Sequence, residues 1–172
     1  MSSPTSTSGA AIPHPVPLVY RLFHLYLEPF SAIVGAAQSL FTTPTYLSII
    51  TQPNVYVSGA PLTSLNHLLL AQVASLYVLL GVFELTVLRP SRDLKIWRGA
   101  IVAISCSDVG HLYAAWVGQG GLEGTSGAFW DPRLWRGEEW INLGLTWFGF
   151  FLRLAFLAGV GMGGVKGARK RE

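Results

Sequence analysis

Residues 65–88 read LNHLLLAQVASLYVLLGVFELTVL, an apolar run in which Glu84 is the only formally charged residue. The hydrocarbon core of a membrane is about 30 Å thick, and about 20 apolar residues in a helix cross it. The run is therefore long enough to be a membrane-spanning helix. Arg89, Pro90 and Ser91 follow directly, and they predict a sharp helix end because proline cannot continue a helix.

Three other stretches share this length and character. With the first, they predict membrane spans at about 18–41, 65–88, 97–117 and 140–162. Hydrophobic residues make up 51% of the chain and charged residues 12%, whereas a soluble domain carries about 25% charged residues. We therefore predict an all-α fold, a four-helix transmembrane bundle that occupies residues 18–162.

The two ends of the chain differ from the bundle in composition. Residues 1–17 are rich in Ser, Thr and Pro and contain no Lys or Arg, so we expect a disordered lead without the basic start of a signal peptide. Residues 163–172 form a basic tail that ends Arg169-Lys170-Arg171-Glu172. This ending loosely resembles the dibasic signal that returns membrane proteins to the endoplasmic reticulum, which is the location we expect.

Lys and Arg predict the orientation, because cytoplasmic loops retain them. The loop before residue 65 has none, and the loop before residue 140 has Arg133 and Arg136. The remaining loop and the tail are much richer, with Arg89, Arg92, Lys95, Arg98, Lys166, Arg169, Lys170 and Arg171. We therefore place this loop and both termini in the cytoplasm.

Polar residues inside the predicted spans are the candidates for function. A charge at the bilayer centre costs at least about 2.5–3.5 kcal/mol, so such residues are commonly paired or functional. In chain order they are Arg21, His24, Glu28, Glu84, Asp108, His111, Asn142 and Arg153.

Depth along the spans groups these residues into two layers. At 1.5 Å per residue, Glu28, Asp108 and Arg153 all reach the middle of the membrane, and His24 and His111 lie beside this central layer. A buried carboxyl group without a partner tends to take up a proton, and a proton held in an apolar pocket suits a general acid. We therefore assign hypothetical catalytic roles to Asp108, Glu28 and His111, and binding roles to His24, Arg153 and Asn142.

Arg21 and Glu84 lie nearer the cytoplasmic edge, and we expect them to form a structural ion pair. The central layer has a purely structural interpretation as well, in which Arg153 fixes helix register through ion pairs.

We assign no metal, because ligands on separate helices have no diagnostic local spacing, and we assign no cofactor. Nucleic-acid binding is not expected, because the net charge of +3 depends on the basic tail.

Several strings resemble a family of small fungal membrane proteins of unknown function, over roughly residues 18–160. The strings are YRLFHLYLEP at 20–29, DLKIWR at 93–98, SDVGHLY at 107–113 and the segment from Asn142 to Arg153. The resemblance implies a four-helix membrane domain and no activity. The architecture also resembles the emopamil-binding, sterol-isomerase-like bundles, which hold intramembrane carboxylates against a lipid-sized pocket, but no motif matches residue by residue.

Three classes of function remain open, and whether the chain is an enzyme is undecided. The first is a protein that binds or converts a lipid or terpenoid ligand by proton transfer. The second is a structural or assembly partner of another membrane protein, with Gly159 and Gly163 as a close-packing ridge. The third is a small transporter, ranked last because four short spans leave little room for a solute path.

Overall fold

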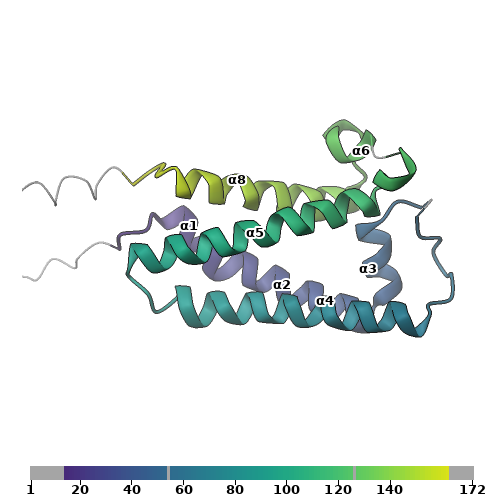
Figure 1. Cartoon of the computed structure of the whole chain (residues 1–172), viewed down its shortest axis with the longest axis horizontal. Helices are drawn as coiled ribbons and strands as arrows, with labels where there is room; N and C mark the ends of the chain where they lie inside the picture. The colour runs from purple at the N-terminus through teal and green to yellow at the C-terminus, as the bar shows by residue number, and fades with distance from the viewer. Residues whose placement is uncertain (1–13, 54, 126, 163–172) are drawn as a thin grey trace, which may run out of the picture.

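The computed structural model describes residues 14–53, 55–125 and 127–162, and within these ranges all regular structure is helical (Figure 1). Three helices are long and apolar enough to cross a membrane: Ser64–Leu88, Leu94–Gly118 and Gly137–Leu157. The all-α prediction is therefore confirmed, and the three apolar helices indicate a membrane-embedded protein.

The helical elements include both α-helices and short π- or 3-10-helical segments. In chain order they are α1 (Leu18–Leu22), η1 (Phe23–Leu27), α2 (Glu28–Phe41), α3 (Thr43–Ile50), α4 (Ser64–Phe83), η2 (Glu84–Leu88), α5 (Leu94–Gly118), η3 (Gly121–Glu123), α6 (Gly127–Trp130), η4 (Pro132–Leu134), α7 (Gly137–Glu139), η5 (Trp140–Gly144) and α8 (Leu145–Leu157). The segments η1, η2 and η5 are π-helical.

Elements α1, η1 and α2 follow one another without a break over residues 18–41. This run is not one of the three most apolar helices, because Arg21, His24, Glu28 and Gln38 lower its mean hydropathy. Pro29 lies at the start of α2, directly after the π-helical segment η1, and its missing N–H removes one backbone hydrogen bond from this continuous run.

Small residues let α2 approach α4 closely. A Cβ added at Gly81 would lie 3.4 Å from the backbone oxygen of Pro29, and one added at Gly35 would lie 3.2 Å from the ring of Tyr77. Close approach through glycine is typical of helix pairs in membranes. In Figure 1 α4, α5 and α8 run along the long axis of the molecule, with α2 alongside α4.

Polar side chains cap the first turns of α4 and α5. Thr63 and Asn66 form a capping box before α4, and the side chain of Asp93 accepts a hydrogen bond of 2.7 Å from the backbone N–H of Lys95 at the start of α5. Such caps satisfy backbone donors that the first helical turn leaves free.

The buried side chains form two apolar clusters. One contains Val16, Tyr20, Leu25, Leu88, Trp97, Ala100, Ile101, Phe156 and Met162. The other contains Leu112, Ala115, Phe129 and Leu143. Many large apolar side chains on α2, α4, α5 and α8 stay exposed instead, such as Phe30, Leu76, Leu79 and Phe151, as expected of helices that face lipid.

The last long helix ends earlier than the predicted span at 140–162. α8 ends at Leu157, and Gly159 and Gly161 follow with φ of 82° and 77°. Left-handed backbone of this kind ends helices and favours glycine. Gly159 therefore lies in a turn and not on a helical ridge, while Gly163 lies outside the described residues, as does the tail at 163–172.

The N-terminal lead also differs from the prediction where it is described. Val16 is buried, with 1% of its surface exposed, and the ring centroid of His14 lies 6.3 Å from that of Trp97. The end of the predicted disordered lead is therefore packed, because an apolar side chain there completes the cluster around Trp97. Residues 1–13 lie outside the described part of the chain.

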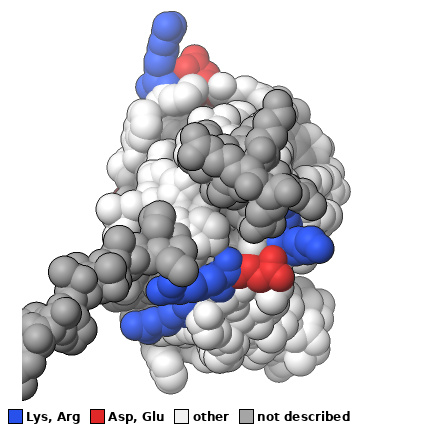
Figure 2. Space-filling model, turned by 90° about the vertical axis from the view of Figure 1, so that its left-hand side faces the viewer, with Lys and Arg blue, Asp and Glu red and all other residues white. Residues whose placement is uncertain are grey.

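The two ends of the molecule carry different side chains. The side chains of Arg89, Arg92, Lys95 and Arg98 are exposed around the turn between η2 and α5. Figure 2 looks onto this end and shows a group of basic side chains, with acidic ones beside it, on an otherwise largely uncharged surface. Tyr20 donates a hydrogen bond of 2.9 Å to the backbone oxygen of Val160, so α1 begins at the same end where α8 finishes.

Candidate functional site

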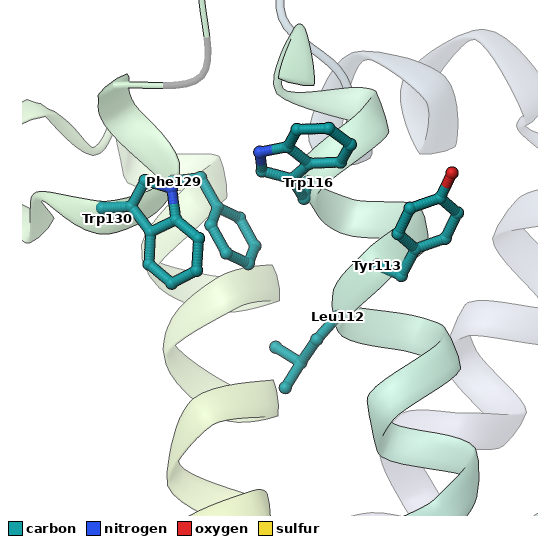
Figure 3. Close-up of a pocket in the computed structure, with 5 residues that line it drawn as sticks. All are labelled: Leu112, Tyr113, Trp116, Phe129 and Trp130. Atoms are coloured by element: carbon teal, nitrogen blue, oxygen red, sulfur yellow. The ribbon is translucent and has the colours of Figure 1, made fainter. Parts of the chain in front are cut away.

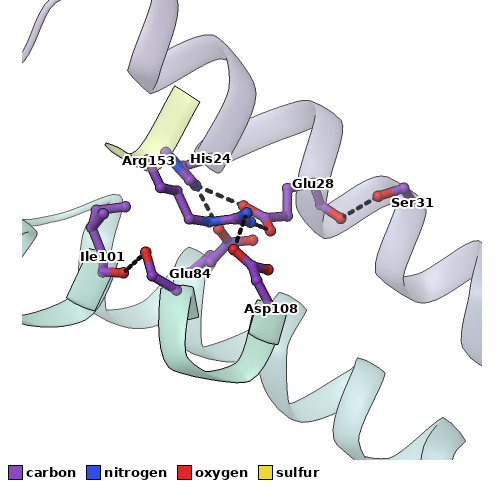
Figure 4. A network of polar contacts seen from close by, with 8 residues as sticks. His24, Glu28, Ser31, Glu84, Ile101, Asp108 and Arg153 are labelled. Carbon is purple, nitrogen blue, oxygen red and sulfur yellow. Dashed lines mark hydrogen bonds and ion pairs between the residues drawn. The ribbon is translucent and has the colours of Figure 1, made fainter. Parts of the chain in front are cut away.

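Five polar side chains from four parts of the chain meet inside the apolar helices (Figure 4). They are His24 on η1, Glu28 on α2, Glu84 on η2, Asp108 on α5 and Arg153 on α8. We call these five residues the central cluster. The structure brings together the three residues predicted for the middle of the membrane and adds Glu84, which the sequence reading placed in a separate layer.

Arg153 joins two helices through its guanidinium group. Its Nη1 donates to Oδ2 of Asp108 at 2.7 Å, and its Nη2 forms an ion pair with Oε1 of Glu28. Only 2% of Arg153 is exposed. A planar guanidinium can satisfy two carboxylates at once, so Arg153 holds α8 against both α2 and α5.

A glycine one turn earlier makes room for this arrangement. A Cβ added at Gly149 would lie 2.9 Å from Cζ of Phe23 and 3.0 Å from Nη1 of Arg153. The guanidinium carbon lies 5.7 Å from the centroid of the Phe23 ring, close enough for a cation–π contact. Gly149 therefore lets Arg153 and Phe23 share one side of α8.

His24 links Glu28 to the third carboxyl group of the cluster, Glu84. Its Nδ1 lies 2.6 Å from Oε2 of Glu28 and 3.1 Å from Oε1 of Glu84. His24 and Glu84 are both wholly buried. Oε2 of Glu84, Nε2 of His24 and Nε of Arg153 are buried without a hydrogen-bond partner among the described residues.

The backbone around this contact is π-helical on both sides. His24 lies within η1, and Glu84 is the first residue of η2; the two segments pack against each other. Short π-helical segments within α-helices are rare and occur often at functional sites. Sequence patterns did not reveal them.

The central cluster is unbalanced in charge. Three carboxyl groups face one guanidinium and one imidazole, which leaves two excess negative charges if every carboxyl is ionised and His24 is neutral. Uncompensated charge is very costly in an apolar interior. The cluster therefore has to hold protons or a bound cation, and both are chemically useful.

The predicted ion pair between Arg21 and Glu84 is wrong. Glu84 contacts His24, and Nε of Arg21 has no hydrogen-bond partner among the described residues. Straight α-helices would place Arg21 and Glu84 at a similar depth, whereas the π-helical turns η1 and η2 alter the rise and the facing of these side chains.

Two other predicted residues lie apart from the central cluster. The ring of His111 packs edge-on to Tyr77 on α4, with centroids 6.3 Å apart, and no described contact joins it to the cluster. Asn142 lies in η5, where its backbone oxygen accepts a hydrogen bond of 2.8 Å from the hydroxyl of Thr146.

A second polar network lies at the opposite end of the molecule, and the sequence reading missed it. Nε2 of Gln52 donates to Oε1 of Gln119 and to Oε1 of Glu139, both at 2.6 Å. Arg136 adds an ion pair of 2.7 Å to Glu139 and a hydrogen bond of 2.9 Å to the backbone oxygen of Thr51. Because its members come from loops and helix ends far apart in the chain, no local pattern indicated this network.

An apolar cavity of about 240 Å³ lies between α5 and α6. Figure 3 shows its lining, which consists of Leu112, Tyr113, Trp116, Phe129 and Trp130. Leu112 follows Asp108 by one helical turn on the same face of α5. Asp108 itself is not among the residues that line the cavity.

Comparison with known proteins defines the family. The sequence profile of the domain of unknown function DUF7704 matches residues 14–163, and the chain belongs to this family. No curated protein and no solved structure matches significantly.

Proposed function

For this member of the DUF7704 family we propose a membrane protein with four spans, with the α1–η1–α2 run as the fourth. Both termini and the turn between η2 and α5 would face the cytoplasm, and the endoplasmic reticulum is the expected membrane. The exposed basic side chains Arg89, Arg92, Lys95 and Arg98 support this orientation. Fungal origin and the likeness to emopamil-binding bundles remain predictions.

Single cysteines test the topology. Cys106 is the sole cysteine of the chain, so a Cys106→Ser background can carry Arg92→Cys or Leu122→Cys, both at exposed positions on opposite ends. In sealed microsomes an impermeant maleimide should label Arg92→Cys and should reach Leu122→Cys only after permeabilisation. Labelling of both positions, or of Leu122→Cys alone, would contradict the proposal.

We further propose that the central cluster binds and converts a lipid or terpenoid ligand by proton transfer. The observation that carries this proposal is the excess of carboxyl groups in a buried site, because it favours a retained proton. Asp108 is the carboxyl best placed to act as the acid: 13% of its side chain is exposed, against 10% for Glu28 and none for Glu84.

Each residue then has a defined part. Asp108 donates a proton to one carbon of a substrate double bond, and the resulting carbocation loses a proton from a neighbouring carbon to a carboxylate. The double bond moves and no oxidant or reductant is needed. Glu28 and His24 pass the proton that the carbocation loses between them. His24 thus takes the role that we first assigned to His111. Arg153 holds Asp108 and Glu28 in position.

The aromatic cavity supports a substrate of this kind. Its lining residues are almost entirely apolar, which suits the hydrocarbon part of such a substrate. A terpenoid chain that enters from the side of Trp116 and Trp130 would point its buried end along α5 toward Asp108.

Lipid and terpenoid profiling tests the proposal directly. Cells with the wild type, a deletion, Asp108→Asn and the control Asp131→Asn would be compared at matched protein levels. Asp131 caps η4, and asparagine preserves that role. We expect Asp108→Asn to reproduce the metabolite change of the deletion and Asp131→Asn to resemble the wild type. If the deletion changes no metabolite, the enzymatic proposal fails.

A non-enzymatic role is the second candidate, and one observation favours it. Arg153 is almost wholly buried and satisfies carboxylates on two other helices, as expected of a contact that fixes helix positions. In that case Asp108→Asn would lower the protein level or change a membrane-protein partner and leave lipids unchanged. A transporter stays the third and weakest proposal.

A further inference from the structure

We propose that His24, Glu28 and Glu84 form a buried binding site for one divalent transition-metal ion of the Zn²⁺ type. Each residue offers one ligand atom, and these atoms all lie within 4.8 Å of one another. The inference depends only on these contacts and does not require the conversion of a lipid.

The spacing of the ligand atoms is close to what such an ion needs. Ligands at about 2.0–2.1 Å around a tetrahedral Zn²⁺ lie about 3.3 Å apart. Nδ1 of His24 lies 3.1 Å from Oε1 of Glu84 and 2.6 Å from Oε2 of Glu28. An ion could therefore replace the proton in the shorter contact after an adjustment of less than about 1 Å.

Unsatisfied buried atoms provide an independent indication. The carboxyl group of Glu84 is directed at His24 and is wholly buried, yet its Oε2 has no hydrogen-bond partner among the described residues. Buried polar atoms are nearly always satisfied by protein, water or an ion. A cation bound by both oxygens of this carboxyl group would give Oε2 the partner that it lacks.

Charge balance also favours a divalent ion. With all three carboxyl groups ionised, the central cluster exceeds its guanidinium by two negative charges, which one divalent cation neutralises completely. The proton proposed above for Asp108 then belongs to the metal-free site. Glu28 can serve both partners, because its Oε1 pairs with Arg153 while its Oε2 faces His24. Arg153 would then orient a ligand from outside, as residues around metal ligands commonly do.

The donor set indicates the class of metal. One imidazole with two carboxylates suits Zn²⁺, Mn²⁺ or Fe²⁺ better than the soft ions that prefer thiolates. Three protein ligands leave a fourth position open, which is typical of catalytic zinc sites. His24 and Glu28 lie only four residues apart, but Glu84 lies 60 residues from His24. The sequence prediction, which assigned no metal, therefore had no spacing that joined all three ligands.

Metal binding by the purified full-length protein tests the site. Protein stripped with a chelator would be titrated with Zn²⁺, and bound metal measured by mass spectrometry after desalting. We expect one ion per wild-type chain and at least a tenfold weaker affinity for Glu84→Gln. The control Glu139→Gln alters another wholly buried carboxylate, outside the central cluster, and should bind as the wild type does.

X-ray absorption at the zinc edge identifies the ligand atoms in the wild type, and it tests the site even if Glu84→Gln does not fold. We expect nitrogen and oxygen ligands that include one imidazole, without sulfur. The proposal is overturned if the stripped wild type takes up no stoichiometric Zn²⁺, if folded Glu84→Gln binds as tightly as the wild type, or if the sulfur of Cys106 is a ligand.

Discussion

Nδ1 of His24 lies 3.1 Å from Oε1 of Glu84, and both side chains are wholly buried. The contact joins two π-helical segments, η1 and η2, across 60 residues of chain. It extends the polar contacts of Arg153, Glu28 and Asp108 into one continuous network. Stability and function should therefore both respond to changes at this network.

Replacing Arg153 with methionine should destabilise the protein strongly. The substitution leaves Glu28 and Asp108 buried without their cation, and loss of one partner from a buried ion pair costs about 3–5 kcal/mol. Unfolding with increasing SDS in mixed micelles would measure the change in free energy. The triple variant Arg153→Met, Glu28→Gln, Asp108→Asn removes the uncompensated charges and should recover a large part of the loss. Equal stability of Arg153→Met and the wild type would contradict the structural role of these ion pairs.

An added methyl group at Gly149 should displace Arg153. The new Cβ would meet Cζ of Phe23 at 2.9 Å and Nη1 of Arg153 at 3.0 Å, and overpacking of this kind costs about 1–3 kcal/mol. Gly149→Ala should therefore lower the melting temperature. Gly110→Ala is the matched control, because a Cβ there meets nothing within 4 Å and alanine is the better helix former. A melting temperature for Gly149→Ala as high as that of Gly110→Ala would count against the packing described.

Glu139 should matter far more than its neighbour Glu138. Truncation in Glu139→Ala leaves Arg136 and Gln52 without their shared acceptor, at a cost of about 1–3 kcal/mol or more. Glu138 is exposed, so Glu138→Ala should change stability by less than about 0.5 kcal/mol. Protease nicking of the segment between α5 and α8 would report the local loosening. Similar nicking rates for the two variants would show that this network does not hold the loops.

If the proposed lipid or terpenoid ligand occupies the aromatic cavity, filling that cavity should weaken its binding. Leu112→Phe places a larger side chain in the cavity wall, whereas Val109→Phe makes a matched change on α5 at a position that is 60% exposed. Binding of a radiolabelled terpenoid alcohol or sterol to protein in nanodiscs would be compared. We expect reduced binding for Leu112→Phe alone; an equal reduction for both variants would place the ligand elsewhere.

The apolar composition and the long hydrophobic runs were enough to predict an all-α membrane protein. Three of the four predicted runs are confirmed as helices that can span a membrane, because in a bilayer the length and hydropathy of a segment largely decide its fate. Helix ends were less accurate: α8 stops before Gly159, since a change of backbone conformation at glycine leaves little trace in hydropathy.

The free-energy cost of placing a charged side chain inside a membrane also identified most members of the central cluster from the sequence. Glu28, Asp108 and Arg153 were expected together because charged groups in an apolar medium need one another. Which histidine joins them was not predictable, since His24 and His111 have equal chemistry and differ only in where the helices turn them. The partner of Glu84 was missed for the same reason.

The sequence by itself thus determined that this chain is helical and apolar, and that the charged side chains inside its apolar helices must be paired. Tertiary structure alone decided the pairing, through the π-helical turns at η1 and η2, the gap left by Gly149, and the meeting of Gln52, Gln119 and Glu139 at the far end. The physical reason is that the free energy of transfer to an apolar medium depends on the composition of each segment alone. Hydrogen bonds and ion pairs, in contrast, depend on distances of a few ångströms between segments that the chain separates widely.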